Sequence, residues 1–203
     1  MTNKPIRIAI LASGNGTNAQ QITEHFATRP DVQVSCIIYN KKDAYVAERA
    51  KNMGVESHYF CRKDFMETDS VLNYLRERQV DWLVLAGFLL LVPQNLLDAF
   101  PGHIINIHPA LLPNHGGKGM YGHFVHEAVV ANREATSGIT IHLVDERFDH
   151  GTILFQARCK VAPSDTPDDL AAKIHTLEKT YYPSVVEAIV KGAAMPLQDK
   201  PLE

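Results

Sequence analysis

Two polar side chains interrupt an apolar run in a way that suits acyl-transfer chemistry. Asn106 and His108 lie in the segment Ile104–Pro109, and a strand would place both side chains on one face. An amide that donates a hydrogen bond and an imidazole that carries charge can together stabilise an oxyanion. The alternative is a satisfied polar pair that closes a strand, because buried polar groups are costly unless they are hydrogen-bonded. These residues by themselves leave both interpretations open.

A glycine-containing segment near the amino terminus suits a phosphate. Ser13–Asn18 reads Ser-Gly-Asn-Gly-Thr-Asn and separates an expected strand from an expected helix. Glycine lets the backbone approach a ligand, and a helix start offers free N–H groups to an anion. The segment lacks the third glycine of a dinucleotide fingerprint and the Gly-Lys-Ser/Thr ending of a P-loop. A phosphate site and an ordinary strand-to-helix turn both remain open.

Two further loops carry charges that could join such a site. Asp145–Gly151 contains three acidic residues, which most often form a solvated turn. A carboxylate from this loop near His108 would raise the pKa of that imidazole. Asn114–Gly122 contains four glycines and Lys118, which could meet an anion. A flexible surface loop is the alternative for this second segment.

The ten histidines raise the question of a metal site. His123 and His126 are three apart on an expected helix, and Glu127 follows them. The pattern is not His-Glu-x-x-His, and no second acidic partner follows at metal-site spacing. The three cysteines contain no Cys-x-x-Cys pair. The sequence therefore predicts no metal.

Alternating apolar and amphipathic stretches must position these residues. Short apolar runs predict parallel strands at Ile6–Leu11, Val32–Tyr39, Trp82–Ala86 and His103–Ile107. Helices are expected at Asn18–Ala27 with Asn18 as a cap, Ala44–Met53, Thr68–Gln79, Leu96–Phe100 and Gly122–Ala131. Ligands bind at the carboxyl ends of strands in open α/β sheets, where the candidate segments lie.

The pattern changes from Gly138 onward. Ile139–Leu143 alternates apolar with polar residues, and Ile153–Val161 is a second strand-like stretch, so we expect an added antiparallel pair. Pro167 to about Val190 is a long helical pattern that Pro183 should kink or split. We predict an α/β fold with one domain over residues 1–203. It has an open, mostly parallel Rossmann-like sheet, helices on both faces and antiparallel strands toward the C-terminus.

Charge and segment lengths exclude several classes of protein. The chain has 203 residues with 20 basic against 23 acidic side chains and a net charge of −3. This charge does not attract nucleic acid or a membrane surface. Ile6–Ala12 is too short for a signal core or a membrane span, and the cysteines suit a reducing cytosol. We expect a cytoplasmic protein acting on small molecules, with its oligomeric state open.

Together these motifs resemble those of formyltransferases that use 10-formyltetrahydrofolate. Asn106–Pro113 reads Asn-x-His-Pro-x-Leu-Leu-Pro, and Asp-x-x-x-Asp-x-Gly follows about forty residues later. Ser13–Asn18 and Leu85–Phe88 narrow the resemblance to members that formylate the amine of phosphoribosylglycinamide (GAR) in purine biosynthesis. The resemblance extends from Ile6 to about Tyr182, and it implies the formyltransferase fold.

The resemblance implies a role for each motif. His108 would be the catalytic imidazole, Asn106 the amide that holds the formyl oxygen, and Asp149 the carboxylate that raises the pKa of His108. The substrate amine would attack the formyl carbon and form a tetrahedral oxyanion. The substrate phosphate would bind Gly16, Thr17 and Asn18, and the substrate amine would contact Glu178. The folate would bind Leu89, Leu90, Leu91, Val92, Asn106 and Asp145. 10-Formyltetrahydrofolate would be the cosubstrate, without a metal.

The sequence departs from the pattern of the family at two positions that would bind the folate tail. Many relatives carry Arg where this chain has Leu90, and a second Arg expected near Phe65 has no clear match, although Arg62 and Lys63 are near. We hypothesise that Lys118 supplies a missing positive charge.

Other members act on charged initiator tRNA, on nucleotide sugars, or hydrolyse formyl-folate. The enzyme that acts on tRNA would need an extra carboxyl-terminal domain and a basic surface. The hydrolase usually has an amino-terminal regulatory domain. We expect neither enzyme here. Nucleotide-sugar enzymes fit the early phosphate loop less well. Outside the family, a non-catalytic nucleotide-binding protein and a metal hydrolase are the alternatives.

Overall fold

One mixed sheet runs through the protein. The computed structural model describes residues 4–193 and 200–201. In these ranges the strand order is β3-β2-β1-β4-β5-β6-β7-β8. The strands are β1 (Ile6–Ala12), β2 (Val32–Tyr39), β3 (Ser57–Tyr59), β4 (Trp82–Leu85), β5 (Ile104–His108), β6 (Thr136–Leu143), β7 (Ile153–Lys160) and β8 (Lys200–Pro201). Strands β1 to β5 pair in parallel, whereas β6 pairs antiparallel with β5 and β7. The predicted α/β fold with added antiparallel strands is confirmed.

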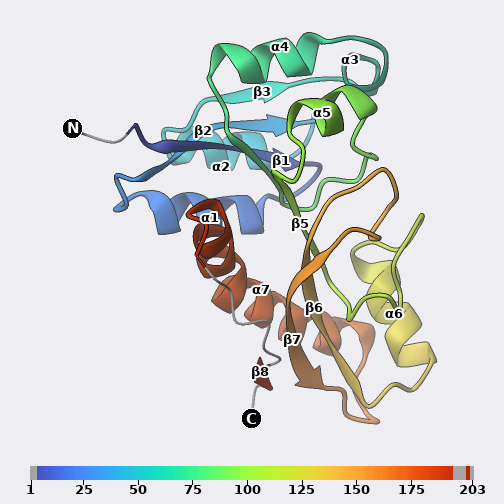
Figure 1. Ribbon diagram of the computed structural model, residues 1–203. Coiled ribbons are helices and arrows are strands. Elements are labelled where there is room, and N and C mark those ends of the chain that lie inside the picture. The colour runs from blue at the N-terminus through green and yellow to red at the C-terminus, as the bar shows by residue number, and fades with distance from the viewer. Residues whose placement is uncertain (1–3, 194–199, 202–203) are drawn as a thin grey trace.

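Helices cover both faces of this sheet (Figure 1). They are α1 (Thr17–Phe26), α2 (Val46–Asn52), α3 (Arg62–Glu67), α4 (Ser70–Glu77), α5 (Gln94–Ala99), α6 (His123–Ala131) and α7 (Pro167–Val190). Apolar residues of α1, α2, α6 and α7 share one core with the sheet, and those of α3, α4 and α5 share a second. Among the described residues, no helix is both long and apolar enough to cross a membrane.

Strand β1 explains why the central strands are apolar almost throughout. Ile8 and Ile10 face the first core, and Ala9 and Leu11 face the second. Because side chains alternate along a strand, a strand covered on both faces needs apolar residues at every position. All four are fully buried. This burial fixes β1 in the centre of the sheet, and the segment after it therefore reaches the carboxyl edge.

Three local features differ from the expectations. Asn18 does not cap α1, because Gly16 occupies the cap position with a left-handed backbone, φ 78°. Pro183 does not split α7, which is continuous from Pro167 to Val190. Its neighbour Tyr182 is fully buried and donates a 2.8 Å hydrogen bond to the Leu85 carbonyl, so packing offsets the backbone bond that proline loses. Third, β3 and α3 have no counterpart among the expected elements, because they are too short to show a periodic pattern.

Candidate active site

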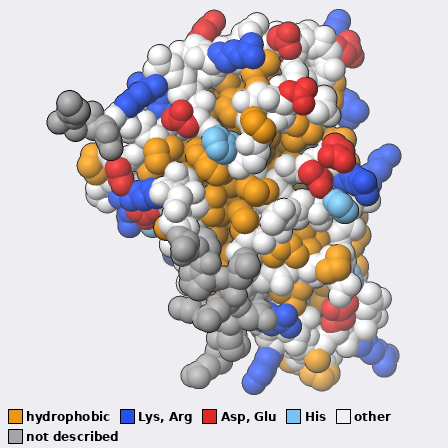
Figure 2. All heavy atoms as spheres, in the orientation of Figure 1, with side chains coloured by type: hydrophobic (Ala, Val, Ile, Leu, Met, Phe, Trp, Pro, Cys, Tyr) orange, Lys and Arg blue, Asp and Glu red, His pale blue; other side chains and the backbone are white. Residues whose placement is uncertain are grey.

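A cavity of about 860 Å³ lies where β4 and β5 end. It is lined by the segments after those strands, by the glycine-rich loop before α6, by the segment after β6, and by side chains of α1, α3, α6 and α7. Seen in the orientation of Figure 1, hydrophobic side chains gather across the middle of the face, and most charged side chains lie around them (Figure 2). The volume is in the range that binds small molecules.

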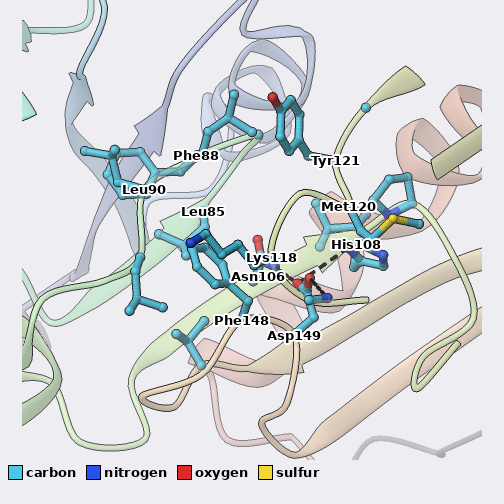
Figure 3. Close-up of a pocket in the computed structure, with 18 of the residues that line it drawn as sticks. Leu85, Phe88, Leu90, Asn106, His108, Lys118, Met120, Tyr121, Phe148 and Asp149 are labelled. Atoms are coloured by element: carbon cyan, nitrogen blue, oxygen red, sulfur yellow. Dashed lines mark hydrogen bonds and ion pairs between the residues drawn. The ribbon is translucent and has the colours of Figure 1, made fainter. Parts of the chain in front are cut away.

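Asn106, His108 and Asp149 come together in this cavity (Figure 3). His108 is 3% exposed. Its Nδ1 lies 3.4 Å from the Asp149 carboxylate, and its Nε2 lies 2.8 Å from the carbonyl oxygen of His115. Both partners are hydrogen-bond acceptors, and an imidazole offers a donor to each only when both of its nitrogens carry hydrogen. Each ring nitrogen of His108 therefore faces an acceptor.

Asp149 is held ionised by its neighbours. Burial by itself would raise the pKa of this carboxyl, but the nearby His108 and His142 rings outweigh it and hold the pKa well below the usual range. The backbone N–H of Gly117 adds a 2.9 Å hydrogen bond to the second carboxylate oxygen. Asp149 has φ 56°, which is uncommon for a residue other than glycine. The bond from Gly117 ties the glycine-rich loop to the Asp149 carboxylate.

His142 is a site residue that the sequence analysis missed. It pairs with Asn106 in the β5–β6 register. Its Nδ1 lies 2.7 Å from the Leu143 carbonyl, an acceptor, and its Nε2 lies 3.0 Å from the Asn106 amide nitrogen, a donor. The same amide nitrogen also donates a long, 3.5 Å hydrogen bond to the Asp149 carboxylate, so its second hydrogen must turn from Asp149 to reach an oxyanion. The sequence signal that could have identified His142 is its polar position in the alternating pattern of Ile139–Leu143.

The polar end of the cavity is formed by side chains from three helices. Asn18 of α1, His126 of α6, and His175 and Glu178 of α7 line it. The Asn18 side chain hydrogen-bonds to Glu178, and burial raises the pKa of that carboxyl. These contacts bring together Asn18 and Glu178, which the sequence could not connect.

Gly16 and Thr17 lie beside this end and are not among the lining residues. A Cβ on Gly16 would come within 2.4 Å of the Val46 side chain, so packing alone requires glycine there.

The apolar end is formed mainly by one continuous segment. Leu89, Leu90, Leu91 and Val92 all line the cavity, next to Phe88. The Leu89 N–H donates a 2.9 Å hydrogen bond to the buried Ser13 hydroxyl, which fixes the start of this segment. In Figure 3, Phe88 and Leu90 lie apart from His108 and Asp149.

Side chains of mixed character complete the cavity lining. Phe148 and Tyr121 are exposed aromatic residues that line the cavity. Lys118 lines it as well, together with Arg62 and Arg147. Asp145 does not line it: its carboxylate accepts from the Arg147 backbone N–H at 2.9 Å and contacts His150 at 2.8 Å. Asp145 therefore shapes the loop that carries Phe148.

A comparison with protein families places the chain. The sequence pattern described as formyl transferase matches residues 6–186. The chain belongs to the formyl transferase family. The match includes the carboxyl ends of β4 and β5 and the whole cavity lining named above.

Several formyl transferases that share one name resemble the chain over most of its length. The phosphoribosylglycinamide formyltransferase of Haemophilus influenzae is 34% identical over 92% of this chain and 88% of its own length. The chloroplastic enzyme of that name from Arabidopsis thaliana is 40% identical over 90% of this chain, which spans 65% of that relative's length.

Solved structures show the same fold. That of phosphoribosylglycinamide formyltransferase from Anaplasma phagocytophilum has a TM-score of 0.87 at 29% identity, covering 98% of this chain and 100% of that one. The enzyme from Streptococcus pneumoniae has a TM-score of 0.80 at 38% identity, covering 91% and 98%.

Proposed function

We propose that this formyl transferase moves the formyl group of 10-formyltetrahydrofolate to the amine of phosphoribosylglycinamide, a step of purine biosynthesis. The names of its relatives support this substrate pair. The observation that carries the proposal is the position of Asn106, His108 and Asp149 in one cavity with a polar and an apolar end. Two different substrates can therefore meet at one set of reactive side chains.

The three side chains suit a tetrahedral oxyanion. The substrate amine attacks the formyl carbon, and the carbonyl oxygen becomes negatively charged. Asn106 donates a hydrogen bond through the amide hydrogen that otherwise faces Asp149, and the charged His108 ring adds a second donor. Asp149 stabilises that ring through Nδ1. A proton then passes from the amine to the departing folate nitrogen through His108 or a water molecule. The His115 carbonyl occupies Nε2 of His108. The substrate must therefore displace this carbonyl before it can bind to the His108 ring.

The apolar end suits the flat, largely apolar ring system of a folate. Leu89, Leu90, Leu91 and Val92 supply the pocket, and Phe148 supplies an aromatic face. A folate tail carries carboxylates, and position 90 offers no guanidinium. Lys118, Arg62 and Arg147 line the same cavity and provide positive charge for that tail.

The polar end suits the amine substrate. Glu178 offers a carboxylate to the amine, and Asn18 supplies an amide at the start of α1. Gly16 and Thr17 at the same helix start offer backbone N–H groups to the phosphate.

An absorbance assay of the purified protein tests this function. With phosphoribosylglycinamide and 10-formyl-dideazafolate, we expect deformylation of the folate that depends on the amine. Folate consumption without the amine indicates a hydrolase. Turnover with an amino sugar nucleotide but not with phosphoribosylglycinamide indicates a nucleotide-sugar enzyme.

A second measurement separates an enzyme from a binding protein. His108→Ala should bind both substrates in isothermal titration while losing turnover. If the wild-type protein binds the ligands and shows no turnover with any amine, the proposal is wrong.

A further inference from the structure

One buried histidine in the cavity has no part in the chemistry described above. His126 lies in α6, is 4% exposed and lines the cavity wall. Its Nδ1 is buried and has no hydrogen-bond partner among the described residues. Buried polar atoms are nearly always paired, and an unpaired one lowers stability. A partner that binds from the cavity would remove this cost.

The surroundings of His126 keep its ring uncharged. Burial lowers the pKa of His126 to about 4. Three other histidines add to this effect, namely His175, His123 and His108. At neutral pH the ring therefore carries one N–H donor and one lone pair. It attracts a phosphate or a carboxylate poorly, and it suits a neutral or cationic group that donates or accepts a hydrogen bond.

The position of His126 points to the amine substrate. His126 lies within electrostatic range of His175 on α7 and of the catalytic His108. His175 lines the cavity with Glu178, one turn further along the same helix. His126 thus borders the stretch between the reacting centre and the carboxylate that we assign to the amine. The apolar folate end lies away from this stretch.

We propose that His126 is a positioning residue for the amine substrate, whose uncharged polar groups hydrogen-bond to its imidazole. The inference rests on the proposed function, because it assumes that phosphoribosylglycinamide occupies the polar end. Between its phosphate and its amine, this substrate carries an amide and ribose hydroxyls. These groups both donate and accept hydrogen bonds, so they can satisfy either tautomer of the His126 ring. The ring would hold the amine in line with the formyl carbon.

Steady-state kinetics of two variants test the role. His126→Phe keeps an aromatic ring and removes the hydrogen bond, and His126→Gln keeps a neutral polar group. We expect His126→Phe to raise the KM for phosphoribosylglycinamide about 3- to 10-fold, the loss that one neutral hydrogen bond explains. The KM for the folate should stay within about twofold, and His126→Gln should recover most of the loss.

His123→Phe is the matched control, because His123 lies on the same helix and is exposed. It should leave both KM values unchanged. The inference is overturned if His126→Phe leaves the KM for the amine substrate unchanged, or raises both KM values equally.

Nitrogen chemical shifts of the His126 ring in the wild-type protein provide a readout that does not depend on a variant folding. Phosphoribosylglycinamide should shift them, and a folate analogue alone should not. Absence of a shift with bound phosphoribosylglycinamide overturns the inference alone. Absence of any binding of this ligand overturns the proposed function instead.

Discussion

The two ends of the cavity are built in different ways. The apolar end comes mainly from the continuous run Leu89–Val92, which follows β4 directly. The polar end is assembled from Asn18, His126 and Glu178, which lie on three helices far apart in the sequence. A ligand at the apolar end is met by one local segment, whereas a ligand at the polar end depends on the packing of α1, α6 and α7. Asn106, His108 and Asp149 belong to neither end.

Asp149→Asn should have the largest effect, since it acts on the reactive side chains rather than on either end. The neutral amide no longer stabilises the charged His108 ring. We expect kcat to fall by about 100- to 10 000-fold, with both KM values changed only a few-fold. Glu146→Gln is the matched control: it makes the same chemical change in the same loop on an exposed side chain and should leave kcat intact. Equal losses in the two variants would contradict a special role for Asp149.

Glu178→Gln tests the polar end by itself. It keeps a hydrogen-bonding group next to Asn18 but removes the carboxyl that we propose contacts the substrate amine. We expect the KM for phosphoribosylglycinamide to rise about 10- to 100-fold, as for loss of a charge-assisted hydrogen bond, with the KM for the folate nearly unchanged. A rise confined to the folate KM would show that the two ends are assigned the wrong way round.

Acid unfolding tests the buried histidine at the polar end. Burial lowers the pKa of His126 in the folded protein to about 4, from 6.5 for an exposed histidine. Between these values His126 binds a proton in the unfolded chain but not in the folded protein. The free energy of unfolding therefore falls as the pH drops from about 6.5 to 4. Urea unfolding should show this loss, on the order of 1–2 kcal/mol, in the wild type but not in His126→Phe. Parallel pH curves for the two proteins would contradict a neutral His126.

Phe148→Ala should give the smallest effect, at the apolar end. Phe148 is 37% exposed, so its contact with a folate is partial. We expect the KM for the folate to rise about 3- to 10-fold, while that for phosphoribosylglycinamide stays constant. Phe124→Ala, on an exposed aromatic residue that does not line the cavity, is the control. If both variants behave alike, the assignment of the folate to Phe148 fails.

This contrast also explains what the sequence predicts. The run Leu89–Val92 and the pair Asn106 and His108 are each local, so the sequence places them after β4 and within β5. Asp149 is assigned by resemblance, and the β5–β6 pairing that brings its loop to His108 is a long-range contact. Asn18 and Glu178 come together only because two helices pack against each other. The spacing of residues in the sequence does not predict this packing.

Other errors have the same origin. Pro183 is a helix breaker by local rules, yet the burial of Tyr182 holds α7 together. His142 looks like one member of an alternating strand until the β5–β6 register pairs it with Asn106. Gly16 resembles part of a phosphate loop, and the structure adds a packing reason, the approach of Val46. Tertiary contacts determine the role of each of these three residues, and such contacts cannot be predicted from a single sequence.

A crystal structure of the protein with phosphoribosylglycinamide and an unreactive 10-formyl folate analogue tests the central claim most directly. The account predicts the folate ring system against Leu89–Val92 and the amine substrate between Asn18 and Glu178. The formyl carbon should lie within reach of both Asn106 and His108. Both ligands at the same end, or a formyl carbon away from His108 and Asp149, would contradict it.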